Sequence, residues 1–251
     1  MIDIFEVFEQ PLLSEVVLEL RFPIRLKIPD YIKDFQEKVI KEFPNLKEEY
    51  LTRFTIFSEE ASPMPTEKVW EFSNPEINAL CRVLKNRFSI ISNEYKSWKA
   101  YNSKKGFRDV LEFTLEKFLE TYSIKKFDRI GLRYINKIEM KEKSSDWLKK
   151  LFIPIFNLEK YPIEDLNENI VRLRVIKEDQ IDIVIQSTLF TEDKQDYYIL
   201  DFDAYLTEIE DINLMSKADQ LHEVILKEFH SLITDDCRKM MRGETKNEKR
   251  K

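Results

Sequence analysis

Glycine is scarce in this chain, which has three in 251 residues: Gly106, Gly131 and Gly243. Loops that cradle phosphates in P-loop and dinucleotide-binding proteins need several closely spaced glycines, so that the backbone can approach the ligand. The nucleophile elbow of serine hydrolases needs a Gly-x-Ser-x-Gly motif. Three isolated glycines therefore exclude these kinds of site.

Cysteine and histidine are as rare, with two of each. Cys81 and Cys237 do not make a disulfide framework, and the chain lacks the ligand spacing of a usual zinc site. His222 and His230 are eight residues apart on an expected helix, about 12 Å along its axis, so one metal ion cannot bridge them. We expect free thiols, structural histidines and no cofactor.

Long apolar runs are absent as well. None reaches the roughly 18 residues of a membrane-spanning helix, and residues 1–8 lack the basic start of a secretory signal. We therefore expect a cytoplasmic protein that does not enter membranes. The 43% of hydrophobic residues is enough to build a core at this length.

Basic charge is concentrated at one end of an acidic chain of net charge −6. Residues 238–251 carry seven Lys or Arg and two Glu, a net +5, which leaves −11 on the rest. We expect 238–251 to be a basic, disordered tail. Nucleic-acid binding is disfavoured, because an acidic body is poorly suited to contacts with phosphates.

The same order of elements occurs twice along the chain. Residues 14–22 and 129–137 each alternate between apolar and charged positions, as in a half-buried strand, and equivalent positions are 114 residues apart. Each strand is followed by a helix, by further strands and by a closing amphipathic helix. The expected helices are 31–43, 107–122, 146–152 and 217–233, and the expected inner strands are 51–57, 68–72, 79–92, 170–176, 180–189 and 197–205.

This order predicts an α+β protein of two similar β-α-β-β-β-α halves, residues 1–123 and 124–237, packed as one unit. The strands would form antiparallel sheet with the helices on one face. The alternative is that any α+β chain can be divided into two similar strings of elements.

Two acidic residues, Asp201 and Asp203, alternate along the last expected strand and so share a face. With a third oxygen ligand they would hold Mg²⁺ or Mn²⁺, which makes a metal-dependent hydrolase one alternative function. The favoured interpretation is that they form ion pairs with Arg172 and Arg174, which also alternate along a strand.

The opening strands carry a second polar group. If the halves meet along these strands, Glu19 and Arg133 take equivalent positions and would face each other. Alternatively, Arg129 and Arg133 line a groove for an anion, with Tyr134 and Asn136 beside them, because the planar guanidinium binds carboxylate or phosphate in a bidentate way. A nucleic-acid-associated protein that uses these arginines and the basic tail is the other alternative function.

Aromatic residues gather between the strands of the first half and its closing helix. Tyr95, Trp98 and Tyr101 are three apart, which would place them on one side of a helical turn. This spacing favours core packing or a docking surface over stacking with nucleic-acid bases.

Segments that span most of the chain resemble, in order, one known family. They are residues 11–23, 70–73, 92–98, 129–136, 201–205 and 221–223, with Phe229 and 233–234. The family is a sporadically distributed set of uncharacterised prokaryotic proteins, patchy in bacteria and archaea. It offers no activity to transfer, and its distribution implies an accessory of a mobile defence or toxin module.

The element order also resembles the saddle-shaped fold of TATA-box-binding proteins, whose halves meet at their first strands. That fold grips the DNA minor groove with a basic sheet face, whereas the expected faces here carry several acids, so this use is disfavoured. We therefore expect a non-enzymatic binding or regulatory protein that engages a protein partner or a ligand, with a homodimer as one expected assembly.

Overall fold

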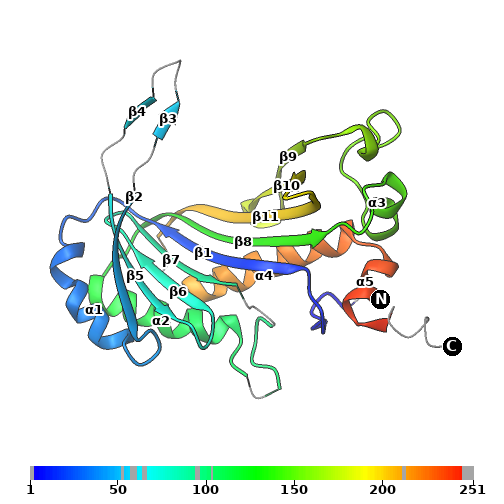
Figure 1. Ribbon diagram of the computed structural model, residues 1–251. Coiled ribbons are helices and arrows are strands. Elements are labelled where there is room, and N and C mark those ends of the chain that lie inside the picture. Colours follow the sequence, from blue (N-terminus) through cyan, green and yellow to red (C-terminus); the bar gives the residue numbers. More distant parts are fainter. Residues whose placement is uncertain are drawn as a thin grey trace.

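The computed structural model describes residues 3–51, 54–56, 61–63, 67–93, 97–102, 104–210 and 213–244. In this part of the chain, nine strands form one antiparallel sheet, and the main helices lie against one of its faces (Figure 1). The α+β class expected from the sequence is confirmed.

The sheet has the strand order β2-β5-β6-β7-β1-β8-β11-β10-β9. Its strands are β1 (Leu13–Arg21), β2 (Asn45–Leu51), β5 (Glu67–Asn74), β6 (Ala79–Val83), β7 (Arg87–Ser92), β8 (Phe127–Glu139), β9 (Asn169–Ile176), β10 (Asp182–Glu192) and β11 (Gln195–Ile209). A separate pair consists of β3 (Phe54–Ile56) and β4 (Ala61–Pro63).

The helices are α1 (Ile32–Val39), α2 (Phe107–Tyr122), α3 (Ser145–Leu151), α4 (Leu214–Leu232) and α5 (Asp235–Met241). Three short 3-10 turns are η1 (Ile28–Tyr31), η2 (Ile163–Asp165) and η3 (Glu178–Gln180). The expected helix at 107–122 has the observed bounds, and the others differ by a few residues at their ends.

The opening strands of the two expected halves, β1 and β8, pair with each other at the centre of the sheet. Each is flanked on its other side by the last strand of its own half, β7 or β11. In each part the later strands of the described sheet approach the centre from the outer edge, but four follow β1 and three follow β8, so the expected β-α-β-β-β-α order does not hold for the first half.

The expected strand at 51–57 is met only in part. Within it the described residues form the short β3, which pairs with β4, whereas the strand that joins the main sheet is β2, which begins six residues earlier. Its sequence, Asn-Leu-Lys-Glu-Glu-Tyr-Leu, is rich in charge, because β2 is an edge strand with little apolar surface to bury. The alternation of apolar and polar residues by which we predicted strands is therefore weak in β2.

Apolar side chains of β1 and β8 that alternate along each strand face the helices and form the centre of the core. Leu18 lies opposite Leu132, and Leu20 opposite Ile130, and all four are fully buried. The packing continues under the first half as a cluster of phenylalanines, in which Phe118 of α2 stacks on Phe88 at a centroid distance of 4.0 Å. Burial of this surface supplies the main stabilisation of the sheet.

The chain beyond residue 237 does not all behave as the expected tail. Helix α5 extends to Met241, which is buried, and the buried Arg238 donates from Nη2 to the carbonyl of His230 at 2.7 Å. The boundary at residue 238 is therefore wrong, since residues 238–244 belong to the folded part. Residues 245–251 lie outside the described residues.

The thiols of Cys81 and Cys237 are free, as expected, and both are buried. Burial raises the pKa of Cys237 to about 12. Among the described helices, none has both the length and the apolar character needed to cross a bilayer.

Candidate ligand-binding cavity

The face of the sheet away from the helices holds the predicted arginines and aspartates. Arg133 Nε donates to Asp201 Oδ1 at 2.8 Å, and Arg129 Nη2 donates to Asp203 Oδ1 at 2.5 Å. Burial raises the pKa of Asp203, although Arg129 opposes this effect. The aspartates are thus held in ion pairs, as the favoured interpretation required.

The partners in those pairs differ from the expected ones. Arg174 Nε donates to Asp182 Oδ1 at 2.8 Å, and Arg172 lies opposite Gln186 of β10. The predicted kind of interaction is therefore correct but the predicted partner strand is wrong, because β8 is the neighbour of β11 and β9 is two strands away. Among the described residues, no group of three His, Cys, Asp or Glu side chains is placed to hold a metal ion.

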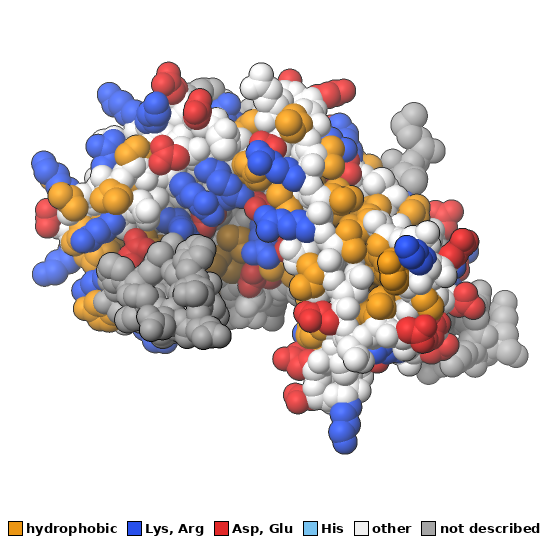
Figure 2. All heavy atoms as spheres, turned by 90° about the horizontal axis from the view of Figure 1, so that it is seen from above, with side chains coloured by type: hydrophobic (Ala, Val, Ile, Leu, Met, Phe, Trp, Pro, Cys, Tyr) orange, Lys and Arg blue, Asp and Glu red, His pale blue; other side chains and the backbone are white. Residues whose placement is uncertain are grey.

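The expected contact between Glu19 and Arg133 is wrong. The register of β1 against β8 places Glu19 opposite Gly131 and Arg133 opposite Val17. Glu19 instead meets Arg129, with Nη1 at 3.3 Å from Oε1. Figure 2, which looks onto this face, shows Lys and Arg side chains gathered near its middle. Both predicted arginines on this face are already paired with acids.

The groove expected to combine these arginines with Tyr134 and Asn136 is also wrong. Successive residues of a strand point to opposite faces, so the odd-numbered arginines and these two even-numbered residues of β8 are separated by the sheet. Tyr134 and Asn136 are buried on the helix side. There they line a cavity of about 770 Å³.

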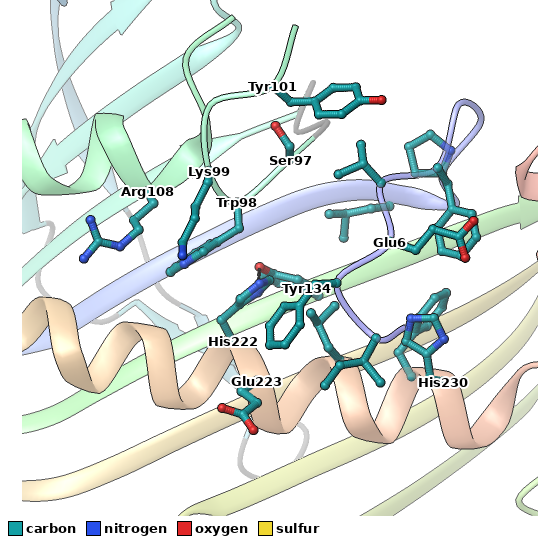
Figure 3. Close-up of a pocket in the computed structure, with 18 of the residues that line it drawn as sticks. Glu6, Ser97, Trp98, Lys99, Tyr101, Arg108, Tyr134, His222, Glu223 and His230 are labelled. Carbon is teal, nitrogen blue, oxygen red and sulfur yellow. Dashed lines mark hydrogen bonds between the residues drawn. The ribbon is translucent and has the colours of Figure 1, made fainter. Parts of the chain in front are cut away.

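This cavity lies where β1 begins and β8 ends. Its walls come from the N-terminal segment, defined here as residues 3–12, together with residues 97–101, β8 and α4. Figure 3 shows Trp98, Tyr134 and His222 at one end, and Glu6 and His230 at the other. Small-molecule sites commonly have volumes of roughly 300 to 1,000 Å³, so the cavity is of the appropriate size.

Trp98 is positioned by the start of α2. The backbone N–H groups of Phe107 and Arg108 donate to the carbonyls of Ser97 and Trp98, at 3.0 and 2.8 Å. A Cβ atom on Gly106 would lie 2.3 Å from the backbone carbon of Lys99, so only glycine allows this close approach. The loop before α2 is thereby fixed against the helix, with the indole directed to the cavity.

The indole of Trp98 stacks on the imidazole of His222 at a centroid distance of 4.3 Å and an angle of 11°. Its Nε1 donates to Asp219 Oδ1 at 2.7 Å, and Arg108 Nε donates to the same atom at 2.9 Å. Burial opposes ionisation of Asp219, but the hydrogen bonds from Arg108 and Trp98 outweigh it and lower its pKa. This network fixes one wall rigidly.

His222 is neutral at physiological pH. Burial lowers its pKa to about 4, against the smaller opposite effect of Asp219. Its Nδ1 lies 2.7 Å from the hydroxyl oxygen of Tyr134. A neutral imidazole has one donor and one acceptor nitrogen, so this wall offers hydrogen bonding without charge.

His230, at the other end of the cavity, is also buried, and burial lowers its pKa. Its ring lies between Phe8 and Phe229, at centroid distances of 6.0 and 5.7 Å. In the described part of the chain, its buried Nδ1 has no hydrogen-bond partner. An unpaired buried polar atom is costly, and a ligand group in the cavity would satisfy it.

The N-terminal segment closes one side of the cavity and is attached to the end of α5. Glu6 binds Arg242 through two hydrogen bonds of 2.6 and 2.7 Å, and the Gln10 N–H donates to the Met241 carbonyl at 2.9 Å. The ring centroids of Phe5 and His222 are 6.2 Å apart, and Phe5 is 56% exposed. Phe8 and Leu12 of the segment also pack against the core, so the segment forms a fixed part of the cavity wall.

Of the predicted binding residues, the structure brings Trp98, Tyr134 and Asn136 together in the cavity and places Arg129 and Arg133 on the opposite face. Tyr95 lies outside the described residues. The described residues 97–102 are not helical, so the expected helical turn is wrong there, although Tyr101 also lines the cavity.

Sequence reasoning missed the N-terminal segment, Asp219 and the role of the two histidines. The apolar residues of the segment Asp-Ile-Phe-Glu-Val-Phe, before the first strand, could have indicated that this segment packs against the protein, because large apolar side chains are mostly buried. No family model, curated protein or solved structure matches this chain.

Proposed function

We propose that this chain is a non-enzymatic binding or regulatory protein that holds a small organic molecule in the cavity beside β8 and α4. One observation carries the proposal: the stacked Trp98 and His222, with Tyr134 against them, form a rigid aromatic wall of a cavity large enough for a ligand. Pre-formed pockets with apolar walls and a few convergent polar groups are typical of such sites.

The lining indicates the chemistry of the ligand. The charged groups at the two ends are already paired, Arg108 with Asp219 and Glu6 with Arg242. The histidines between them carry lowered pKa values and are neutral at pH 7. The site therefore favours a mainly apolar molecule with an aromatic ring, hydrogen-bonding groups and at most one acidic group, because among the described lining residues Lys99 is the one Lys or Arg outside these pairs.

The position of the cavity is consistent with the proposed regulatory role. It adjoins the central strand pair and is closed by the N-terminal segment, so occupancy would change how firmly that segment is held. The resemblance to a patchily distributed prokaryotic family is compatible with an accessory of a defence or toxin module, in which the ligand serves as a signal.

A fluorescent probe tests the proposal. Anilinonaphthalene sulfonate is an aromatic, mainly apolar molecule with a single negative charge, which Lys99 in the lining would meet, and we expect one molecule to bind the native chain saturably. Trp98→Phe should weaken its affinity by about two- to tenfold, because an aromatic pair contributes roughly 0.5–1.5 kcal/mol. Trp70→Phe is the matched control, since Trp70 is buried in β5 and does not line the cavity.

The control variant should bind the probe as the wild type does. Near-ultraviolet circular dichroism of each variant verifies native packing, because partly unfolded chains also bind this probe. The absence of saturable binding, or equal affinities for the two variants, would contradict the proposal.

A further inference from the structure

The two ends of the sheet differ in how they are protected. Among the described strands, β9 is the last of the sheet and pairs only with β10. Its large apolar side chains are exposed: Ile170 by 57%, Leu173 by 41% and Ile176 by 71%. An unprotected, apolar edge strand is a template for pairing with another chain.

The opposite edge strand, β2, carries charges that protect it. Lys47 pairs with Glu49, and Glu48 pairs with Lys68 of the neighbouring β5. Charged side chains on an edge discourage association with other strands. Strand β9 contains no acid or lysine, and its only charged residues are two arginines, so its charge opposes basic strands but not acidic ones.

The charge of β9 has one sign. Arg172 and Arg174 are exposed, and the pairing with β10 places both on the face away from the helices. Arg174 is paired with Asp182 of β10, whereas Arg172 lies across from the uncharged Gln186. The edge thus combines apolar contacts with an uncompensated positive charge on one face.

This charge pattern disfavours a second copy of the chain as the occupant. In antiparallel pairing about a twofold axis through Leu173, Arg172 of one copy lies opposite Arg174 of the other, on the same face. A shift of two residues places like arginines directly opposite each other. Like charges directly opposite across strands are destabilising.

We propose that β9 binds an extended segment of a partner protein that adds to the sheet as a further strand and carries acidic residues at alternate positions. Backbone hydrogen bonds to the free edge would supply affinity, as in known cases of strand addition. The acidic side chains would meet Arg172 and Arg174, and the apolar side chains between them would cover Leu173. This site does not line the cavity and is independent of the ligand proposed above.

Peptide binding tests the proposal. The probe is a fluorescent eight-residue peptide, the length of β9, in which Glu alternates with Val. Its counterpart has Lys in place of Glu. By fluorescence anisotropy with the full chain, we expect saturable binding of the Glu peptide and affinity for the Lys peptide at least about tenfold lower, as two like-charge contacts replace two attractive ones.

Charge reversal identifies the edge. The double variant Arg172→Glu and Arg174→Glu should invert the preference between the peptides, whereas Lys47→Glu on the opposite edge should leave it unchanged. Hydrogen exchange should show new protection of the amides of β9 with the Glu peptide bound. Equal affinity for the two peptides, an unchanged preference in the double variant, or a dimer in which β9 is protected without peptide would each overturn the proposal.

Discussion

The two ends of the central strand pair, β1 with β8, differ in their side chains: one is filled with buried aromatic rings, and the other borders a cavity. Where β1 ends and β8 begins, Phe22 packs on Phe118 and Phe127 at centroid distances of 5.8 and 6.2 Å, and all three rings are buried. Where β1 begins and β8 ends, Tyr134 and Asn136 face the cavity of about 770 Å³. We call these the packed end and the cavity end.

Because of this difference, one end of the strand pair contributes mainly to stability and the other provides the proposed binding site. At the packed end the interior is filled with apolar side chains, which is the arrangement that maximises burial and dispersion contacts. At the cavity end the polar residues Trp98, His222 and Asp219 hold one another in place, so the open space does not collapse. The first end stabilises the sheet, and the second provides a site.

The largest expected effect comes from breaking the packed end. Phe118→Ala removes a ring that contacts Phe22, Phe35 and Phe88 and leaves a hole in a filled core. We expect a loss of about 3–5 kcal/mol in the free energy of unfolding, measured by urea denaturation. A loss below about 1 kcal/mol would show that this end is not tightly packed.

The next effect is a pH dependence that arises at the cavity end. His222 has a pKa of about 4 in the folded chain against an ordinary value of 6.5, so the unfolded state takes up its proton first as the pH falls. Its contribution to stability is complete above pH 6.5 and is lost progressively down to about pH 4. The total is about 3 kcal/mol, of which roughly half is lost by pH 5.

Urea denaturation at pH 6.5 and pH 5 measures this change, and His222→Gln should reduce it. Some dependence should persist in the variant, because the pKa of His230 is lowered too. An unaltered pH dependence in the variant would contradict the assignment to His222.

The smallest expected effect comes from replacing a leucine by the larger phenylalanine, once at the cavity end and once at the packed end. The two variants compare the packing of the two ends directly. Leu226→Phe in α4 projects into the cavity and should cost less than about 1 kcal/mol, while it reduces binding of the fluorescent probe. Leu111→Phe in α2, where the side chain is fully buried, should cost about 1–3 kcal/mol through overpacking. Equal costs in urea denaturation would mean that the two regions are packed alike.

Much of the fold was predictable because its signals are local. The alternation of 14–22 and 129–137 and the helical spacing of 107–122 depend only on neighbouring residues, and each element formed as expected. The charged edge strand β2 was misplaced because its pattern is set by exposure rather than by burial.

The site was predictable only in part. Trp98 and Tyr134 could be singled out by residue type. That they line the same cavity depends on the close backbone approach at Gly106 and on the contact of Tyr134 with His222, 88 residues later in the sequence. The wrong groove arose because Arg133 and Tyr134 are neighbours in sequence but lie on opposite faces of the sheet. Sequence spacing cannot give strand order, which decided the partners of Asp201 and Asp203.

The most direct test of the cavity as a binding site is a nuclear magnetic resonance titration of the histidine rings with anilinonaphthalene sulfonate. The chain has two histidines, and both line the cavity, so their ring signals report on this site without interference from others. We expect both to shift saturably with one equivalent of probe at constant pH, while the native fold is retained. Saturable fluorescence of the probe with unshifted histidine signals would show that the cavity is not the site.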